Sequence, residues 1–278
     1  MTANQKKMVR NALFQILCLA IGFLTIMPIL YALSISFMDQ REILDKGWHL
    51  LPNKIQWDNY KEALRLTPLF RYMWNSLVLA GVSSMVRVIV ASLAAFSFAF
   101  FQFKGKNILF MLFMATMMIP GDVVLITNYK TVANWGLTDS YAGMMAMFLV
   151  SVMNIFMFRQ YYLSFSKDIF EAAKVDGCSN IRFFVKILFP LSKPTIATVY
   201  ISSFVNTWNT YLWPMLVTND DKMRTVQVGV TMLNSKDGGT IYGPIMAASV
   251  IVLIPTILVF VVFRKQIAGG MMSGSVKG

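Results

Sequence analysis

The sequence predicts an all-α, polytopic membrane protein with six transmembrane helices. Hydrophobic residues make up 56% of the 278 residues and charged residues only 14%, whereas roughly 25% of a soluble domain is charged. The apolar residues lie in six runs, each of about 20 residues, the length that crosses a bilayer core of roughly 30 Å. Basic residues are concentrated in alternate connecting segments, as expected for a multi-pass protein.

The apolar runs predict the positions of the spans. They cover residues 13–37, 76–101, 108–126, 141–163, 195–217 and 245–263. Lys6, Lys7 and Arg10 precede the first run in the manner of a secretory signal. The run is longer than the roughly 7–15 apolar residues of a signal peptide, so we expect an uncleaved first span. Pro120 and Pro255 predict kinks in the third and sixth runs.

The distribution of charge predicts the orientation of the spans. The segments expected in the cytoplasm carry 14 basic and three acidic residues, whereas the segments expected outside carry ten of each. Arg87, within the second run, supplies the remaining positive charge of the net +12. Because Lys and Arg in short loops face the cytoplasm, we expect both termini there, with residues 1–10 as a cytoplasmic N-terminus and residues 269–278 as a cytoplasmic tail.

The connecting segments and the residue types exclude several functions. Residues 38–72 and 218–242 are the expected extracytoplasmic loops, and residues 164–194 are the longest expected cytoplasmic loop. The sequence contains no P-loop and only one histidine, His49. We therefore expect no catalytic residue, no metal site and no cofactor in this chain. Spans interrupt the basic residues, so nucleic acid is not an expected partner.

The cytoplasmic loop predicts a helix–turn–helix hairpin. Ser166 is a good N-cap, Gly177 suits a left-handed helix stop, and Ser179 is able to cap a second helix. Pro190 and Pro194 are expected to end that helix before the fifth span. Its apolar residues require cover: Ile169, Phe170, Ala172, Ala173, Val175, Phe183 and Phe184. A linker resting on lipid headgroups and an amphipathic helix docked into a partner account for them equally well.

Four motifs resemble one family. Glu171-Ala172-Ala173, Asp176-Gly177 and Ile187-Leu188-Phe189-Pro190 resemble the EAA signature, E-A-A-x-x-x-G-x9-I-x-L-P, of importer permeases of the ATP-binding-cassette class, with Phe189 at the final Leu position. Asn75-Ser76 and Trp208-Asn209-x-Tyr211-Leu212-Trp213-Pro214 are similar to the second and fifth spans of that family. The tail Gly269-Gly270-x-x-Ser273-Gly274-Ser275-Val276-Lys277-Gly278 resembles the G-x-x-x-G-A-V-K-G ending of the maltose-type second permease, with Ser275 replacing Ala. The resemblance covers essentially the whole chain.

The resemblance implies a type I importer permease fold over residues 11–268 and a set of partners. A coupling element would dock on a separate ATPase dimer through Glu171, Ala172, Ala173, Asp176, Gly177, Phe183, Phe184 and Pro190. Ser275, Lys277 and Gly278 would reach the ATPase interface. A second, homologous permease would complete the pore in a bacterial inner or plasma membrane. An extracytoplasmic solute-binding protein would deliver sugar to residues 218–242, and ATP and Mg²⁺ would bind only to the ATPase.

Polar and aromatic residues within the spans are candidates for the translocation path: Arg87, Asn206, Trp208, Asn209, Tyr211 and Trp213. An intramembrane charge costs roughly 2.5–3.5 kcal/mol or more, which makes it a functional hypothesis. For Arg87, pairing with a carbonyl or a partner's polar group in the protein interior is the favoured interpretation. The polar groups of the fifth run either line a water-filled path, with the indoles as stacking faces, or bond to neighbouring helices or to their own backbone.

We therefore expect a permease half of an ATP-driven importer for a sugar or sugar-like solute of the oligosaccharide, multiple-sugar or glycerol-3-phosphate type. The alternative is an ion-coupled secondary transporter, which usually carries carboxylates or histidines at span centres. The predicted spans contain none except Asp122 near one end. An intramembrane enzyme would need a nucleophile–base pair or a metal cluster at membrane depth, which is not found.

Overall fold

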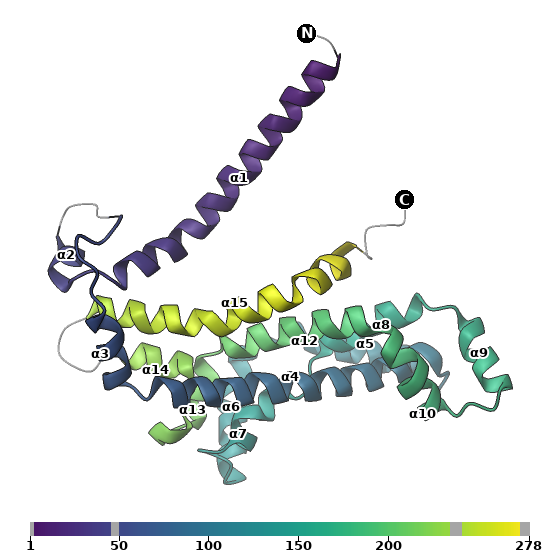
Figure 1. Cartoon of the computed structure of the whole chain (residues 1–278). Helices are drawn as coiled ribbons and strands as arrows, with labels where there is room; N and C mark the ends of the chain where they lie inside the picture. Colours follow the sequence, from purple (N-terminus) through teal and green to yellow (C-terminus); the bar gives the residue numbers. More distant parts are fainter. Residues whose placement is uncertain (1–2, 46–49, 234–240, 273–278) are drawn as a thin grey trace. The chain divides into compact units, whose positions relative to one another are not determined.

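The computed structural model describes residues 3–45, 50–233 and 241–272, and all regular elements in these ranges are helices (Figure 1). The predicted tail contacts Ser275, Lys277 and Gly278 lie outside the described residues.

Three long helices are apolar enough to cross a membrane: α1 (Ala3–Ile35), α4 (Leu69–Phe100) and α15 (Tyr242–Met272). Three bent helix pairs also pass this test, so the described residues contain up to six spans by length and composition. The prediction of an all-α, polytopic membrane protein is therefore confirmed.

The third predicted span is a broken one. Helix α5 (Lys106–Thr116) and α6 (Gly121–Asn134) meet at 95°. Pro120 lies at this break with extended backbone and precedes α6. A proline lacks the N–H that would continue α5, and it disfavours helical backbone at the residue before it. Helix α6 ends at Asn134, so the helical structure extends past residue 126, the predicted end of the third span. In contrast, α15 runs through Pro255 as one helix.

The fourth and fifth predicted spans are also interrupted. The fourth consists of α7 (Tyr141–Met145), the 3₁₀ turn η1 (Ala146–Phe148) and α8 (Val152–Leu163), with a bend of 51°. The fifth run is not one helix over residues 195–217. Helix α12 (Lys193–Trp208) ends before the polar residues Asn209 and Thr210, and a separate short helix, α13 (Leu212–Val217), follows.

The described chain forms two compact units. The first comprises Met1–Leu69 with Val230–Leu253 and contains α1, α2 (Gln40–Leu44) and α3 (Asp58–Leu66). Asn59 donates hydrogen bonds of 3.0 and 2.9 Å to the carbonyls of Ser36 and Met38, and Phe37 packs edge-on against Trp57. The loop after α1 is thus folded onto the end of that helix, whereas the rest of α1 exposes apolar side chains.

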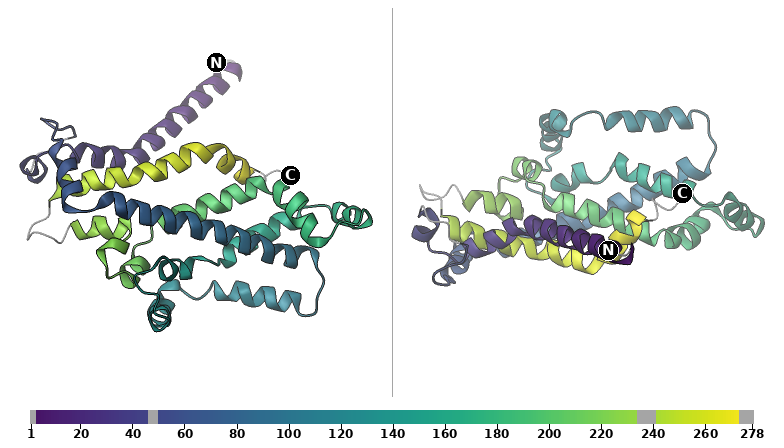
Figure 2. Two further views of the ribbon diagram at one scale, coloured as in Figure 1. Left: turned by 60° about the horizontal axis from the view of Figure 1, so that its bottom comes forward. Right: turned by 90° about the horizontal axis from the view of Figure 1, so that it is seen from above.

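The second unit comprises Phe70–Gly229 with Ile254–Gly278. One core joins the C-terminal half of α4 to α8, α12 and the hairpin helices, with Phe96, Phe158 and Phe183 among its buried residues. A second core joins Leu79 of α4 to Trp213 and to residues of α6 and α7. Figure 2 shows α9 (Lys167–Val175) and α10 (Asn180–Phe183) projecting beyond the helices of this unit.

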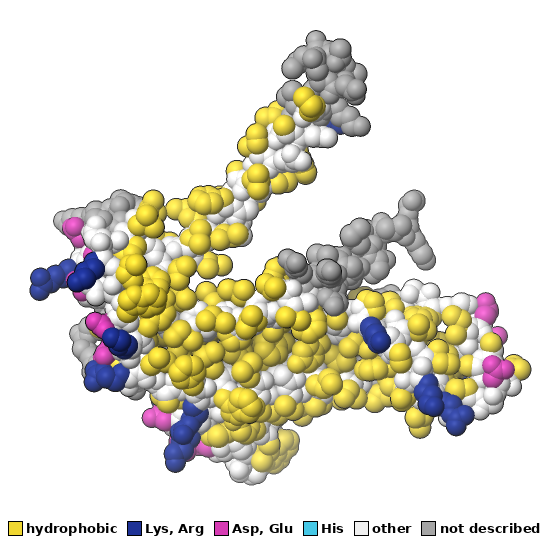
Figure 3. Space-filling view, in the orientation of Figure 1, with side chains coloured by type: hydrophobic (Ala, Val, Ile, Leu, Met, Phe, Trp, Pro, Cys, Tyr) yellow, Lys and Arg dark blue, Asp and Glu magenta, His cyan; other side chains and the backbone are white. Residues whose placement is uncertain are grey.

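The surface has the distribution expected for lipid contact. Hydrophobic side chains cover α1 and the visible face of α4, whereas charged side chains are found around α2, α3 and the α9–α10 hairpin (Figure 3). In a bilayer, apolar side chains on a helix exterior are solvated by lipid and need no protein partner.

Candidate functional site

The helix–turn–helix hairpin over residues 164–194 forms as predicted. Ser166 caps α9 by accepting a hydrogen bond of 3.2 Å from the backbone of Asp168, and Ser179 caps α10 by accepting one of 3.3 Å from Arg182. Gly177 lies in the left-handed region at φ 74°. The amides of Gly177 and Cys178 bond back into the last turn of α9, which is a Schellman motif.

The end of the hairpin differs from the prediction. Pro190 does not end the second helix, because the π-helical turn η2 (Phe184–Leu188) and the short α11 (Phe189–Leu191) carry the chain past it. A proline ring clashes with the carbonyl four residues earlier, here that of Lys186, and the wider π turn gives it room. The chain then bends by 77° into α12, with Pro194 in the first turn.

The predicted coupling residues divide into two groups. Ala173, Phe183 and Phe184 are buried and form part of the hairpin's own core, so they are not accessible to a partner. The Phe170 and Phe183 rings lie 4.9 Å apart in an edge-on contact, and Phe96 of α4 lies 5.3 Å from Phe184. The hairpin is thereby packed against the C-terminal end of α4.

The second group lies on the surface. Exposed coupling residues are Glu171, Ala172, Asp176, Gly177 and Pro190. Two large aliphatic side chains of the hairpin are also exposed, with Val175 at 88% and Ile181 at 77%. A cavity of about 270 Å³ lies beside α9, lined by Glu171, Lys167 and Tyr162 among others. The hairpin therefore presents acidic, small and aliphatic residues together.

Arg87 is buried inside the second unit, with 8% of its surface exposed. Its Nε donates a hydrogen bond of 2.7 Å to the carbonyl of Phe148, and its guanidinium lies 5.8 Å from that ring. Phe148 ends η1 at the break in the fourth span, where carbonyls lack a partner within the helix. Arg87 thus makes the favoured carbonyl contact and stabilises the broken span.

Trp208 and Trp213, expected to offer stacking faces, are both buried. The Trp208 ring stacks on Phe204 at 5.9 Å and 15°, and Trp213 donates from Nε1 to the carbonyl of Met144 at 3.1 Å. Trp213 belongs to the core that contains Leu79, and Trp208 packs along α12 on Phe204. Neither indole presents a free face to a solute in this structure.

A polar face on α12 remains exposed. Ser202 and Asn206 of α12 and Asn209, the residue directly after this helix, are exposed at a helical spacing that places them on one side. Asn209 donates to the carbonyl of Val205 at 2.8 Å, and its side-chain oxygen accepts from Gln227 at 3.4 Å. The alternative in which these polar groups bond to backbone thus holds for Asn209, and a water-filled path along the exposed face stays a prediction. Tyr211 is half-buried at the break.

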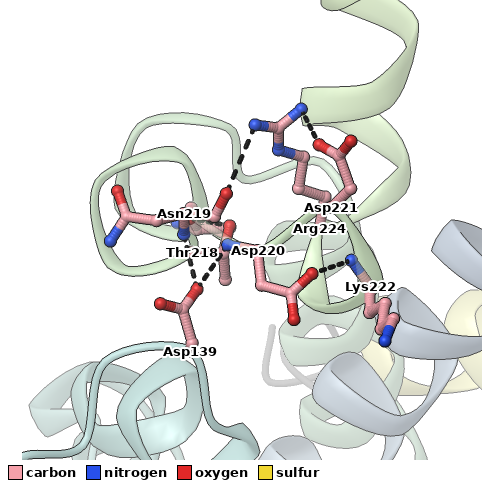
Figure 4. A network of polar contacts seen from close by, with 8 residues as sticks. Asp139, Thr218, Asn219, Asp220, Asp221, Lys222 and Arg224 are labelled. Atoms are coloured by element: carbon pink, nitrogen blue, oxygen red, sulfur yellow. Dashed lines mark hydrogen bonds and ion pairs between the residues drawn. The ribbon is translucent and has the colours of Figure 1, made fainter.

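The sequence analysis did not single out a polar network near the start of residues 218–242. Asp139, between α6 and α7, contacts this loop, as Figure 4 shows, and so do Asn75 and Ser76 at the start of α4. The local signal for Asp139 was its place in a turn after Gly136, since Asp tolerates a left-handed backbone. The loop that it contacts lies 80 residues away in sequence and has no local signal.

These features define a helical membrane protein with interrupted spans and an exposed α9–α10 hairpin. The chain belongs to the family of binding-protein-dependent transport system inner membrane components, whose model matches residues 87–271. It is therefore a multi-pass transport permease, as the EAA-like signature had predicted.

Individual relatives cover almost the whole chain. The arabinooligosaccharides transport system permease protein AraQ of Bacillus subtilis is 33% identical over 261 residues, which span 93% of this chain and 92% of the relative. The sn-glycerol-3-phosphate transport system permease protein UgpE of Brucella abortus is 33% identical over 265 residues, 92% of this chain and 94% of the relative. UgpE of Rhizobium meliloti is 30% identical over 276 residues, 96% and 98% of the two chains.

A solved structure has the same fold. A chain of a bacterial ABC transporter involved in the import of the acidic polysaccharide alginate aligns with a TM-score of 0.82 at 20% identity, over 95% of this chain and 98% of the other. At this identity the likeness concerns the fold alone.

Proposed function

We propose that this chain is one of two permease subunits of an ATP-driven importer for a sugar or sugar-like solute. The observation that carries the proposal is the exposed hairpin around Glu171 and Gly177, which is held rigidly by an aromatic core and has no cover within the described chain. The proposed partner is a separate ATPase dimer, which binds ATP and Mg²⁺.

The hairpin is suited to transmit force. Its caps and the Schellman motif fix its shape, and Phe170, Phe183 and Phe184 link it to Phe96 in α4. A movement of the docked hairpin would thus be passed to α4 and, through α11, to α12. ATP binding in the partner would draw the hairpins of the two permeases together and turn the path from inward- to outward-facing.

The polar face of α12 supports a path for polyhydroxylated solutes. Ser202, Asn206 and Asn209 carry hydroxyl and amide groups that exchange hydrogen bonds with sugar hydroxyls. Arg87 donates from Nε to Phe148 and is buried, which does not favour its contact with a phosphate. The relatives named for arabinooligosaccharides and sn-glycerol 3-phosphate support this solute range, and within it we favour a neutral sugar.

The proposed orientation has α9 and α10 in the cytoplasm. The charge distribution supports cytoplasmic termini and extracytoplasmic loops at residues 38–72 and 218–242. An extracytoplasmic solute-binding protein would deliver the solute to these loops. The tail residues Ser275, Lys277 and Gly278 are proposed to reach the ATPase.

Copurification from native membranes tests the proposal. We expect an ATPase and a second permease with the wild type, and loss of the ATPase with Glu171→Arg or Gly177→Asp. Asp58→Arg, a charge reversal at an exposed acid in α3, is the matched control and should retain both partners. If the wild type purifies alone and moves solute in ATP-depleted vesicles, the chain is an ion-coupled secondary transporter instead.

A further inference from the structure

The side chain of Asp139 binds the backbone at the start of the 218–242 loop. Its Oδ1 accepts hydrogen bonds of 2.5 Å from the amide of Asn219 and 2.8 Å from that of Asp220 (Figure 4). Its own amide donates to the carbonyl of Val217 at 2.8 Å. Asp139 makes these contacts from a left-handed backbone, φ 54°, a conformation that costs free energy for a non-glycine residue.

Asn75 holds the next part of the same loop. Its side chain is 2% exposed, and Nδ2 donates to the carbonyls of Lys222 and Arg224, each at 2.9 Å. Its Oδ1 accepts from the hydroxyl of Tyr141 at 2.7 Å. Ser76, also buried, accepts from the amide of Val226 at 2.9 Å. Three segments far apart in sequence are thus joined at one loop.

The held segment is ordered but exposed at its surface. The side chain of Asp220 accepts from the amide of Lys222 at 2.9 Å, and Arg224 forms an ion pair with Asp221. The side chains of Asn219, Asp220, Asp221 and Lys222 lie on the surface. The backbone groups of a loop that only connects two helices are able to form hydrogen bonds with water. The buried side chain of Asn75 and the left-handed Asp139 are therefore not needed for connection alone.

We propose that Asp139, Asn75 and Ser76 are positioning residues that hold residues 219–222 as a preformed docking edge for the extracytoplasmic solute-binding protein. This proposal rests on the proposed function. The edge is polar and carries charges of both signs, which suits the hydrated rim of a transient protein interface rather than lipid. Fixing it before docking lowers the ordering cost of association.

The same residues connect the edge to the rest of the unit. Asn75 lies near the start of α4, and the far end of α4, at Phe96, packs against the coupling hairpin. Asp139 bonds to the carbonyl of Val217, which ends α13. Docking at residues 219–222 is therefore placed to act on a helix that reaches the hairpin.

The test measures ATPase activity of the full complex in nanodiscs against the concentration of the solute-loaded binding protein purified from the same cells. We expect Asp139→Ala and Asn75→Ala to raise the half-maximal concentration about tenfold, the size expected for lost hydrogen bonds that organise an interface. Activity at saturating binding protein should be unchanged. Asp139→Asn, which keeps an acceptor oxygen, should recover part of the affinity. Asp122→Ala, an exposed acid in α6 outside the network, is the control.

Hydrogen exchange on the same complexes supplies a second readout. The amides of Asn219, Asp220 and Val226 should exchange slowly in the wild type, and the first two should exchange about tenfold faster in Asp139→Ala. Faster exchange with an unchanged half-maximal concentration overturns the proposal, because the segment would be held without being used for docking. Unchanged exchange in Asp139→Ala overturns it as well.

The design separates this proposal from the proposed function. If no binding protein stimulates the wild-type complex, the importer assignment fails. If the wild type is stimulated and Asp139→Ala responds at the same concentrations, only the positioning role fails. A variant with reduced assembly and an unchanged half-maximal concentration in the assembled fraction also counts against the role.

Discussion

Arg87 in α4 donates a hydrogen bond of 2.7 Å from Nε to the carbonyl of Phe148, 61 residues further along the chain. The contact lies where η1 ends and the fourth span bends by 51°. It explains why an arginine is tolerated within an apolar helix: the charge is paired with a carbonyl that has no partner within its own helix. Arg87 is therefore directed into the protein interior, and its place on the translocation path stays a prediction.

Arg87→Met should destabilise the protein without changing its apparent affinity for solute. The carbonyl of Phe148 would lose this partner in a partly buried place, at a cost of up to roughly 1–3 kcal/mol. The stability of Arg87→Lys should lie between those of the wild type and Arg87→Met, because lysine retains the charge but lacks the planar guanidinium donor. Denaturation in detergent and transport KM are the measurements, with Arg10→Met, an exposed site, as the control. A raised KM at normal stability would show instead that Arg87 contributes to the translocation path.

Gly229→Ala should disrupt the packing of α14 (Val226–Leu233) on α4. An added Cβ would lie 2.1 Å from Cδ2 and 2.5 Å from Cε2 of the Tyr72 ring, closer than any normal contact. We expect a loss of roughly 1–3 kcal/mol in the free energy of unfolding, as for overpacked cores. Thermal unfolding measures it. Gly121→Ala, where nothing lies within 4 Å, should leave stability nearly unchanged. Tyr72→Ala together with Gly229→Ala should recover part of the loss.

Substitutions of Gly177 test the effect of its left-handed backbone separately from any steric clash. Nothing lies within 4 Å of a Cβ at this position, but its φ is +74°. Gly177→Ala should therefore cost only roughly 1 kcal/mol, and Gly177→Asn less, since Asn tolerates a left-handed backbone. Solute-stimulated ATPase activity should follow the order Gly, Asn, Ala. Equal loss in Asn and Ala would mean that the partner contacts this position directly.

Asn206 tests the polar face of α12. Asn206→Leu should raise the transport KM several-fold with little change in stability, because the side chain is exposed and makes no hydrogen bond within the described residues. Trp208→Ala should instead leave the KM of the folded protein nearly unchanged and lower the free energy of unfolding by roughly 3–5 kcal/mol, since the Trp208 ring is buried against Phe204. If Asn206→Leu prevents assembly with the second permease and leaves KM unchanged, the polar face is a subunit interface.

Several features of this protein follow from local sequence. The apolar runs predict the helices, the basic residues predict the orientation, and Ser166, Gly177 and Ser179 predict the caps and turn of the hairpin. These features depend on residues within a few positions of one another, so chain geometry and backbone hydrogen bonding decide them. The EAA-like signature lies in the same short stretch, which is why the family was accessible from the sequence.

The tertiary structure alone decided which apolar and polar residues are buried. Trp208 and Trp213 have the composition of path residues but pack in cores, and the partner of Asn75 lies 147 residues away. In a membrane, lipid and protein interior are equally apolar, so hydrophobic periodicity does not distinguish the face that contacts lipid from the face that contacts another helix. The sequence by itself determined the helices, the caps of the hairpin and the break at Pro120, and it predicts the orientation. Packing between distant segments decided the burial of the two indoles, the contact of Arg87 and the hydrogen bonds from Asp139 to its loop.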